Sequence, residues 1–592
     1  MSGVEEQQNG AEKHKPVTPP SEAHGTKLKD LTEDEKAHRD DDVDSASSIT
    51  PRSSTSSSSD ENNHRSSRLS RPGGLHTPSR SLSQAVSVSE IHDDIQVQRD
   101  PELGPHLHEK ISTTAPNPND PNLVTWTGPD DPENPKNWKY SKKWGAVFTV
   151  SLFTLISPVS SSLVAPALNK IGEELHIDSA IERNLTLSIF ILAFAVGPLL
   201  WGPFSELYGR VRVLQLVNLI YLFFNLGCGL AKTRVQLIVF RFFAGLGGSV
   251  SLAVGGGVLG DLFVAEERGK ALALYNLAPL LGPAIGPIAG AFITQNTTWR
   301  WAFYATTIAD AAVQVAGLFF LKETYTPVLL QWKKRRLIKE TGNEDLHTPF
   351  DHPDRTVGKA IRLALTRPMK MITTQVIVQC LALYMLYLYG LIYIVLVSFP
   401  TLWSTPKPDG YGETLGIGGL NYISLGLGFF VGTQVCAPLQ DRIYAALKRK
   451  NGGPGRPEYR VPLMIPGALL VPTGLVIYGW TAEYKTHWIG PNIGTFLFST
   501  GSIIGFQCLQ AYLVDSYTRF AASAVSSGTV LRSLAGFGFP LFAPSLYDSL
   551  GYGWGNTLLA FVGIAIGWPG PFLLWRYGER LRQRSPFAAG GY

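Results

Sequence analysis

The sequence Gly202-Pro203-Phe204-Ser205-Glu206-Leu207-Tyr208-Gly209-Arg210-Val211-Arg212 separates two long apolar runs, at 183–203 and 212–231. Each run has about 20 residues, which is the length that an α-helix needs to cross roughly 30 Å of hydrocarbon. Buried helices of a soluble core are shorter and alternate with polar faces. This turn and its flanks therefore indicate two transmembrane helices joined by a short charged loop.

The loop fits the spacing G-x3-[D/E]-x2-G-R-x-[R/K], with Gly202 and Gly209 as its two glycines. A tight glycine turn brings Glu206, Arg210 and Arg212 to the helix ends. We expect these groups to form ion pairs across a seam between two halves, where such pairs lock one conformation and break in another. The alternative is an ordinary solvated turn that carries charges.

Further apolar runs extend the pattern on both sides of this loop. The sequence predicts twelve transmembrane helices, at 144–165, 183–203, 212–231, 235–257, 270–293, 300–321, 371–397, 418–438, 462–481, 490–513, 521–545 and 555–576. The predicted fold class is an all-α polytopic membrane protein in which the twelve helices form two six-helix bundles.

Composition divides the chain of 592 residues, of which 44% are hydrophobic and 17% charged. Its beginning is rich in Ser, Thr, Asp, Glu and Pro and has too little apolar surface to offset chain entropy. We predict five segments: a disordered cytoplasmic tail at 1–125, an N-terminal bundle at 126–321, a cytoplasmic central loop at 322–370, a C-terminal bundle at 371–580 and a cytoplasmic tail at 581–592.

Lys and Arg gather in the loops of one side, with eleven of them in residues 322–370. Loops rich in Lys and Arg stay in the cytosol, so both termini are expected there. The plasma membrane is the expected location, with the vacuolar membrane as the alternative. Val357–Thr366 has the pattern of a helix lying in the membrane interface or of an ordinary linker.

The two halves carry similar loops at corresponding places. Pro438 and Asp441 each follow Pro203 and Glu206 by 235 residues, and Arg442 adds a cation to the second loop. A six-helix unit used twice is a known plan for transporters, with the substrate site where the units meet. We therefore add Asp441 and Arg442 to the predicted gating motif.

Other motifs resemble those of the major facilitator superfamily, as the loop 202–212 does. Arg241-Phe-Phe-Ala-Gly245-Leu-Gly247 resembles its RxxxGxG element. The residues Gly282, Pro283, Gly286, Pro287 and Gly290 are similar to the signature of the drug:proton antiporter branch, with Ala291 as a departure in the last place. Gly and Pro also permit close or bent helix packing without any antiport role.

Five further stretches are similar to fungal members of the twelve-span antiporter family: 131–138, 299–304, 323–330, 521–524 and 532–540. The resemblance implies the major facilitator fold and export of drugs, toxins, polyamines or secondary metabolites in exchange for protons. A proton-coupled nutrient importer on the same fold and a non-transporting membrane sensor are the alternatives. An enzyme is not expected.

Three ionisable residues lie inside predicted spans, where a charge costs roughly 3 kcal/mol or more. They are Arg241, Asp310 and Arg532. We assign them to proton coupling, because a buried acid can shed and regain a proton between states. The alternatives are that Asp310 hydrogen-bonds Thr306 or nearby backbone, and that Arg532 pairs with an acid or holds helix carbonyls.

Polar and aromatic residues of the spans are candidates to line a substrate pocket, since aromatic walls with few polar contacts suit bulky, partly apolar cargo. The candidates are Asn276, Gln379, Tyr384, Tyr387, Gln507, Gln510 and Phe537. Each of them also suits ordinary helix packing.

Several other sites are not expected. The run 255–260 matches GxGxxG but ends a long helix, so a dinucleotide site is improbable. Cys228, Cys380, Cys436 and Cys508 stand apart, which argues against a zinc site or disulfide frame. We expect no cofactor, no metal and no nucleic-acid partner; the partners are a small-molecule substrate, protons and the lipid bilayer, and the protein is expected to be a monomer. Asn296 begins a glycosylation sequon close to the membrane.

Overall fold

The computed structural model describes residues 120–351, 356–452 and 455–588. These residues belong to one compact unit, Pro78–Tyr592. The predicted disordered tail lies outside the described residues up to residue 119. The last six residues of that predicted tail, 120–125, are placed, and Val124 among them is buried.

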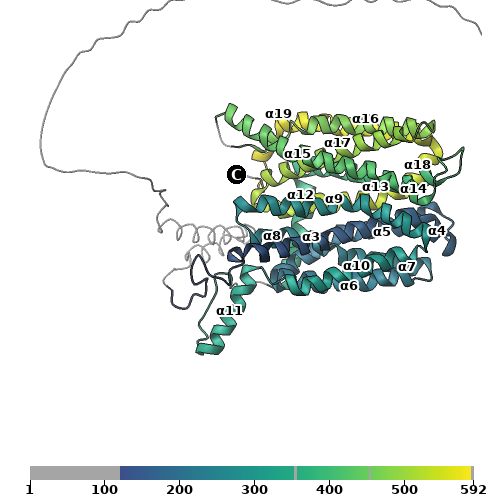
Figure 1. The fold of residues 1–592 in the computed structure, drawn as a ribbon. Helices are drawn as coiled ribbons and strands as arrows, with labels where there is room; N and C mark the ends of the chain where they lie inside the picture. Colours follow the sequence, from purple (N-terminus) through teal and green to yellow (C-terminus); the bar gives the residue numbers. More distant parts are fainter. Residues whose placement is uncertain (1–119, 352–355, 453–454, 589–592) are drawn as a thin grey trace, which may run out of the picture. The chain divides into compact units, whose positions relative to one another are not determined.

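The first half of the described chain is a succession of helices (Figure 1). These are η1 (Pro135–Asn137), α3 (Tyr140–Ser162), η2 (Ala165–Ala167), α4 (Leu168–Glu174), α5 (Ala180–Tyr208), α6 (Arg210–Leu230), α7 (Arg234–Gly248), α8 (Val250–Leu262), α9 (Ala265–Asn296) and α10 (Arg300–Phe320).

Two helices of the central loop and the second half follow. These are α11 (Thr326–Thr341), α12 (Val357–Thr374), α13 (Val376–Ser404), α14 (Leu415–Leu420), α15 (Tyr422–Lys450), η3 (Pro457–Arg460), α16 (Met464–Glu483), α17 (Ile489–Ser516), η4 (Thr518–Phe520), α18 (Ala521–Gly567) and α19 (Pro569–Gln583).

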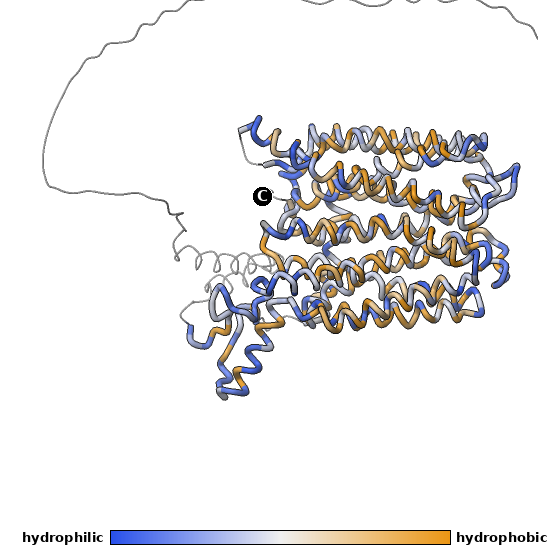
Figure 2. Tube along the Cα trace, viewed as in Figure 1, coloured by the Kyte–Doolittle hydropathy of each residue, from blue (hydrophilic) through white to orange (hydrophobic). Residues whose placement is uncertain are grey.

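Among the described residues, eleven helices are long and apolar enough to cross a membrane. The last of them, Ala521–Gln583, has 63 residues and breaks at Gly551, whose φ of 69° is left-handed. A single crossing needs about 20 residues, so this element supplies two of the twelve predicted spans. Apolar residues follow the length of the helices in Figure 2, and the predicted all-α membrane fold is confirmed.

Packing follows the two predicted bundles. In the first half α3 packs against α9, and α6 packs against α7 and α10. In the second half α16 packs against α17, and α13 against α18. The halves meet where α5 lies against α18 and where α9 lies against α14 and α15. We call these two lines of contact the seam.

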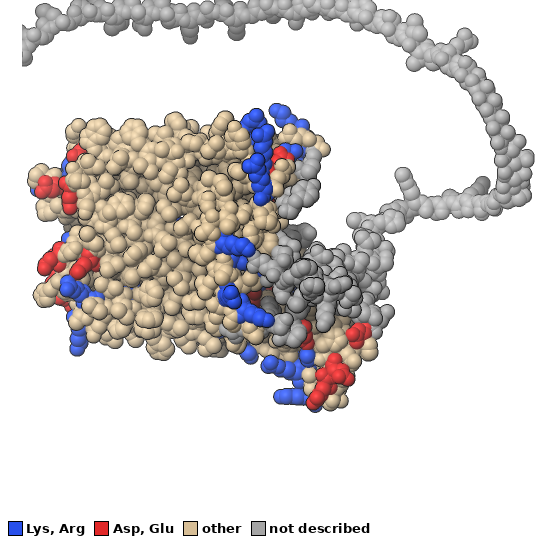
Figure 3. Space-filling view, turned by 180° about the vertical axis from the view of Figure 1, so that it is seen from behind, with Lys and Arg blue, Asp and Glu red and all other residues tan. Residues whose placement is uncertain are grey.

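Lys and Arg side chains crowd one end of the helices, visible in Figure 3 beside the residues drawn in grey. This basic end carries the α5–α6 turn, α12 and the last turn of α15, Lys448–Lys450. The other end, here called the opposite end, carries the α9–α10 turn and the break at Gly551. The helix α12 extends the predicted interfacial segment from residue 366 to Thr374, and it packs against both α5 and α18.

The segment before α3 is tied to the central loop. Asp131, which is only 5% exposed, accepts hydrogen bonds from the Thr127 N–H and hydroxyl and from Lys333 of α11. The backbone of Val124 donates to the carbonyl of His347. We call these contacts between residues 120–137 and 333–351 the clasp. They hold the segment that precedes the first span against the linker between the halves.

Candidate functional site

The predicted charged loop lies at the basic end, and its arginine is paired inside the N-terminal half. The Arg210 Nε donates to the Asp261 carboxylate at 2.6 Å, at the end of α8. The prediction that Arg210 pairs across the seam is wrong for this conformation. Asp261 does the pairing, and its place at the end of the fourth span was the signal in the sequence.

Glu323 completes this network from the end of the sixth span. Its carboxylate accepts from the backbone N–H groups of Arg210 and Val211, the first two residues of α6. A carboxylate there satisfies free N–H groups and faces the positive end of the helix dipole. Gly209, with φ of 104°, leaves the space that Glu323 fills. Sequence reasoning had quoted Glu323 only as part of a family resemblance.

The remaining predicted members of the first loop lie around this network. The Arg212 guanidinium stacks on Trp332 of α11 at 4.2 Å from the ring centre. Gly202 has open space around its Cα. Glu206 contributes a favourable electrostatic interaction to Arg210. The loop therefore joins α5, α6 and the central loop at one place.

The C-terminal half repeats the pairing with different residues. Arg460, next to α16, donates to Asp515 and to Asp441, both at 2.9 Å. The predicted Asp441 thus takes part in an ion pair, again inside its own half. Arg442 is exposed instead, and Arg460 supplies the cation. The sequence repeat located the acids correctly but chose the wrong arginine.

Arg241 is fully buried in the first half, where it closes the end of a helix. Its guanidinium donates to the carbonyls of Ser160 and Ser161 at 3.1 and 3.2 Å, and to Thr186 at 3.1 Å. Ser160 and Ser161 belong to the last turn of α3, whose carbonyls have no partners within the helix. Among the described residues Arg241 has no acidic partner, so these carbonyls carry its charge.

Asp310 is also buried, at 1% exposure. One carboxylate oxygen accepts from the Asn218 amide at 2.8 Å, and the other has no hydrogen-bond partner within the described residues. The expected alternative of a bond to Thr306 is wrong, because Thr306 bonds Asn225. Asp310 therefore lies between α6 and α10, inside the N-terminal half and away from the seam.

The glycine-rich helix α9 has two different faces. A Cβ added at Gly282, Gly286 or Gly290 would collide with the end of α3. Ala284 and Ala291 lie on the other face, against Gly426 of α15 and Gly419 of α14. Pro283 and Pro287 lie within the same helix. The predicted antiporter motif thus packs α9 within its own half, and the departure at Ala291 fits a glycine across the seam.

Side-chain hydrogen bonds join the halves toward the opposite end. The Gly416 N–H donates to Gln295 Oε1 at 2.6 Å, and Asn184 Nδ2 donates to the Pro540 carbonyl at 2.7 Å. The side chains of the basic-end ion pairs remain within their own halves. The seam is therefore fastened at the opposite end.

The predicted pocket residues lie on four helices, α9, α13, α17 and α18. Tyr384 and Tyr387 are buried inside the C-terminal half, where the Tyr387 hydroxyl donates to the Leu559 carbonyl. Gln507 bonds Thr433, and Gln379 bonds the Thr373 carbonyl. The others differ in exposure: Asn276 and Gln510 are exposed and Phe537 is half-buried. These seven residues therefore differ in burial and in hydrogen bonding, and their place in one substrate site stays a prediction.

Arg532 lies where a central site is expected, in the first part of α18. Its guanidinium lies over Tyr389 of α13 at 4.9 Å and over Phe506 of α17 at 5.5 Å. Sequence reasoning missed both rings. Tyr389 lies about 140° around the helix from Tyr384, so the helical period places it on the face turned away from the predicted tyrosine.

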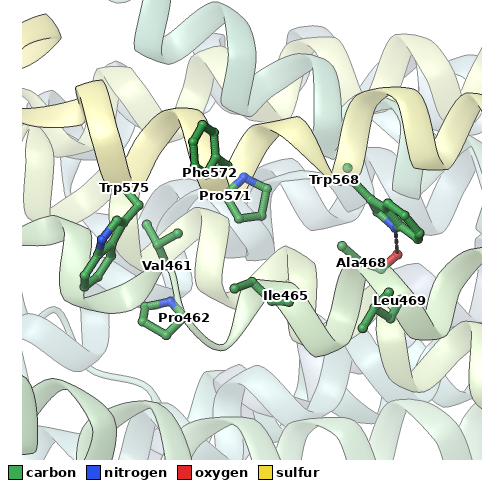
Figure 4. A pocket seen from close by; sticks show the side chains of 10 residues that line it. Val461, Pro462, Ile465, Ala468, Leu469, Trp568, Pro571, Phe572 and Trp575 are labelled. Atoms are coloured by element: carbon green, nitrogen blue, oxygen red, sulfur yellow. Dashed lines mark hydrogen bonds between the residues drawn. The ribbon is translucent and has the colours of Figure 1, made fainter.

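A shallow apolar groove of about 440 Å³ lies elsewhere, between α16 and the α18–α19 junction (Figure 4). Trp568 there donates to the Ala468 carbonyl, and Ile465 and Phe572 are exposed. An apolar surface on the outside of a transmembrane bundle is suited to lipid. The groove adds nothing to the central site.

Comparisons with known proteins agree with this architecture. The Major Facilitator Superfamily profile matches residues 150–540. The chain is 52% identical to "Efflux pump vrtL" of Penicillium aethiopicum over 80% of this chain and 92% of that protein. It is 40% identical to "MFS-type transporter penM" of Penicillium rubens, over 87% and 99%.

Solved structures match more distantly. The xylose transporter XylE from E. coli, in a partially occluded inward open conformation, aligns with a TM-score of 0.55 at 14% identity, over 74% of this chain and 98% of that one. A second XylE structure, bound to 6-bromo-6-deoxy-D-glucose, aligns with a TM-score of 0.54 over 74% and 96%. At this identity the likeness concerns the fold alone.

Proposed function

Because this chain belongs to the Major Facilitator Superfamily, we propose that it exports small organic molecules in exchange for protons by alternating access. It is a multi-pass membrane transporter of that superfamily. A relative 52% identical to it is named an efflux pump, which supports export over import. The plasma membrane, with both termini in the cytosol, is the location that we propose.

The observation that carries the proposal is the unequal seam. Hydrogen bonds fasten the two halves at Gln295–Gly416 and Asn184–Pro540, toward the opposite end. At the basic end Arg210 and Arg460 each pair with an acid of their own half. With the basic end in the cytosol, we infer that the halves part at this end, where an exporter takes up its cargo. An importer releases cargo through the same conformation, so the choice of export rests on the relative that is named an efflux pump.

Proton coupling needs a group that changes protonation as the halves move. Asp310 is the acid near the middle of a described span, and one of its oxygens has no donor. Its partner Asn218 lies on α6, whose first residues are held by Glu323 at the basic end. We propose Asp310 as the coupling acid, while Arg241 maintains the contact between α3, α5 and α7.

The test uses the full chain in proteoliposomes, with a proton gradient of either sign and a fluorescent cargo. Sided cysteine labelling identifies the inserted orientation. The proposal predicts that cargo accumulates on the side away from the basic end when that side is acidic. Accumulation that ignores the gradient contradicts antiport. Accumulation toward the basic end identifies an importer.

A further inference from the structure

We propose that Arg532 binds an anionic group of the cargo, so that the protein carries acidic aromatic compounds and not polyamines or other cations. This inference deepens the proposed transport function and rests on it. It identifies the class of substrate from the charge of Arg532 and from the aromatic side chains around it, and we call this place the central site.

Arg532 lies on the face of α18 that is turned toward the other half. Gly536 follows it by one helical turn and therefore shares its face, and a Cβ at Gly536 would meet Ile191 of α5 and the Tyr389 ring. Arg532 itself is half-buried. The guanidinium therefore lies at the seam, on the basic-end side of the contact between Gly536 and α5. Its partial exposure leaves it accessible to a ligand.

Within the described residues, Arg532 has aromatic neighbours but no hydrogen-bond acceptor or acid. A guanidinium has five N–H donors, and a cation inside a membrane protein is costly unless these are used. Arg241 donates hydrogen bonds to three carbonyls, and Arg210 and Arg460 are paired with aspartates. Of these four arginines, Arg532 is the one whose N–H donors are free, within the described residues, to bind a ligand.

The positions of the acidic residues in the spans argue against a cationic cargo. A polyamine or other cationic cargo needs a carboxylate in the central site. Asp310 is the acid near mid-span among the described residues, and it is 1% exposed and bonded to Asn218 inside the N-terminal half. Asp261 and Asp515 lie at helix ends and are paired with arginines. The charge available at the seam is therefore positive.

The walls favour an aromatic cargo. Tyr389 and Phe506 flank the guanidinium, and the Tyr393 ring packs against Tyr389 in a tilted arrangement, 5.1 Å between ring centres. Flat rings pack well on such walls, and a carboxylate accepts two parallel N–H bonds from arginine, one on each oxygen. A ring system that carries one acidic group therefore satisfies both features.

The test is equilibrium binding of four probes to the full chain in nanodiscs of neutral lipid. The probes are anthracene-9-carboxylate, its methyl ester, 9-(aminomethyl)anthracene and the aliphatic acid decanoate. We expect the carboxylate to bind about ten- to hundredfold more tightly than the ester or amine, as for a hydrogen-bonded charge pair. Decanoate is expected to bind more weakly, because it lacks the ring.

Arg532→Gln should remove the preference for the carboxylate over the ester, and Arg532→Lys should keep part of it, because lysine offers charge without the planar fork. Arg449→Gln, at the exposed end of α15, is the matched control and should bind as wild type does. Unfolding midpoints of all variants separate a lost site from a lost fold.

Three outcomes would overturn the inference: preference for the amine, no binding of any probe by the wild-type protein, or an unchanged carboxylate preference in Arg532→Gln. Because binding is measured without a gradient, a failure of proton antiport leaves the result unaffected. Proton-driven export of a cationic cargo would sink this inference and leave the proposed function standing.

Discussion

The backbone N–H of Gly416 in α14 donates a 2.6 Å hydrogen bond to the side chain of Gln295 at the end of α9, and this bond joins the two halves of the molecule. It lies at the opposite end, where the chain carries few cations. Its loss should weaken the contact that keeps this end closed.

We therefore predict that Gln295→Ala opens the opposite end more often. Loss of a partly buried hydrogen bond costs about 1 kcal/mol, which shifts the populations of the two conformations about fivefold. A cysteine introduced at the contact, such as Ala291→Cys, should react faster with a membrane-impermeant thiol reagent in this background. Asn296→Ala removes a side chain that bonds only within its own helix, so its labelling rate should match wild type; equal rates in both variants would contradict the prediction.

The paired network at the basic end should be sensitive to charge. Asp261→Asn leaves the Arg210 guanidinium without its 2.6 Å partner, and removal of one member of a buried pair costs about 3 kcal/mol. We expect a clear fall in the unfolding midpoint. A double variant, Arg210→Gln with Asp261→Asn, should lose less than the two single variants add up to, and strict additivity would show that the pair is not coupled.

Packing at the glycine face of α9 should be strict. In Gly286→Ala the new methyl meets Ser162 and the Val159 carbonyl of α3, and overpacking of this kind costs about 1–3 kcal/mol. Gly256→Ala, in a helix with no atom near the new methyl, is the control and should be neutral or stabilising. Thermal unfolding of the two variants tests this. A lower midpoint in Gly286→Ala alone supports a packing role, and equal midpoints would show that this position tolerates any small residue.

Asp310→Asn should separate transport from coupling. Asparagine keeps an oxygen that accepts from Asn218, so the fold should survive. Uphill export driven by a proton gradient should fall at least tenfold, while exchange of labelled for unlabelled cargo continues. Asp548→Asn, at an exposed position just before the break in α18 at Gly551, should export normally. Normal uphill export by Asp310→Asn would remove Asp310 from the coupling mechanism.

The clasp should resist mild acid. Burial alone raises the pKa of Asp131, but the N–H groups of Thr127 and Glu133, the Thr127 hydroxyl and Lys333 together lower it from 3.8 to about 2. A depressed pKa contributes stability that is full above the unfolded value and lost as the pH falls toward 2, here about 2 kcal/mol. The protection factors of the amides of residues 120–138, which are corrected for the intrinsic pH dependence of exchange, should thus be constant from pH 5 to 8 and lower in Asp131→Asn. A fall in protection already at pH 6 would assign the clasp to another group.

The spans could be predicted because hydrocarbon thickness dictates their length. Arg241 was found for a similar reason, since a charge inside an apolar run is visible in the sequence. The partners of Arg241 could not be predicted, because backbone carbonyls at the end of α3 have no sequence signature. The break at Gly551 shows that a prediction of two spans can be right where the backbone continues as one long element.

The site was predicted less well, because contacts between halves depend on three-dimensional register. The repeat located Asp441, yet the arginine that pairs with it is Arg460 and not Arg442. The tyrosines of α13 were chosen by type alone, and the helical period would have separated the buried Tyr387 from Tyr389. Arg532 was placed correctly near mid-span, but the sequence could not tell that it lacks an acidic partner.

Opposite movements of the two ends test the account most directly. Spin labels at Glu267 and Lys448 report the basic end, and labels at Lys232 and Thr486 report the opposite end, in a background with Cys380 replaced. The distance between each pair is measured by double electron–electron resonance in nanodiscs, with and without cargo and at two pH values. Alternating access predicts that the basic-end distance shortens under the same conditions in which the opposite-end distance lengthens. Distances that stay fixed, or that change together in one direction, would contradict it.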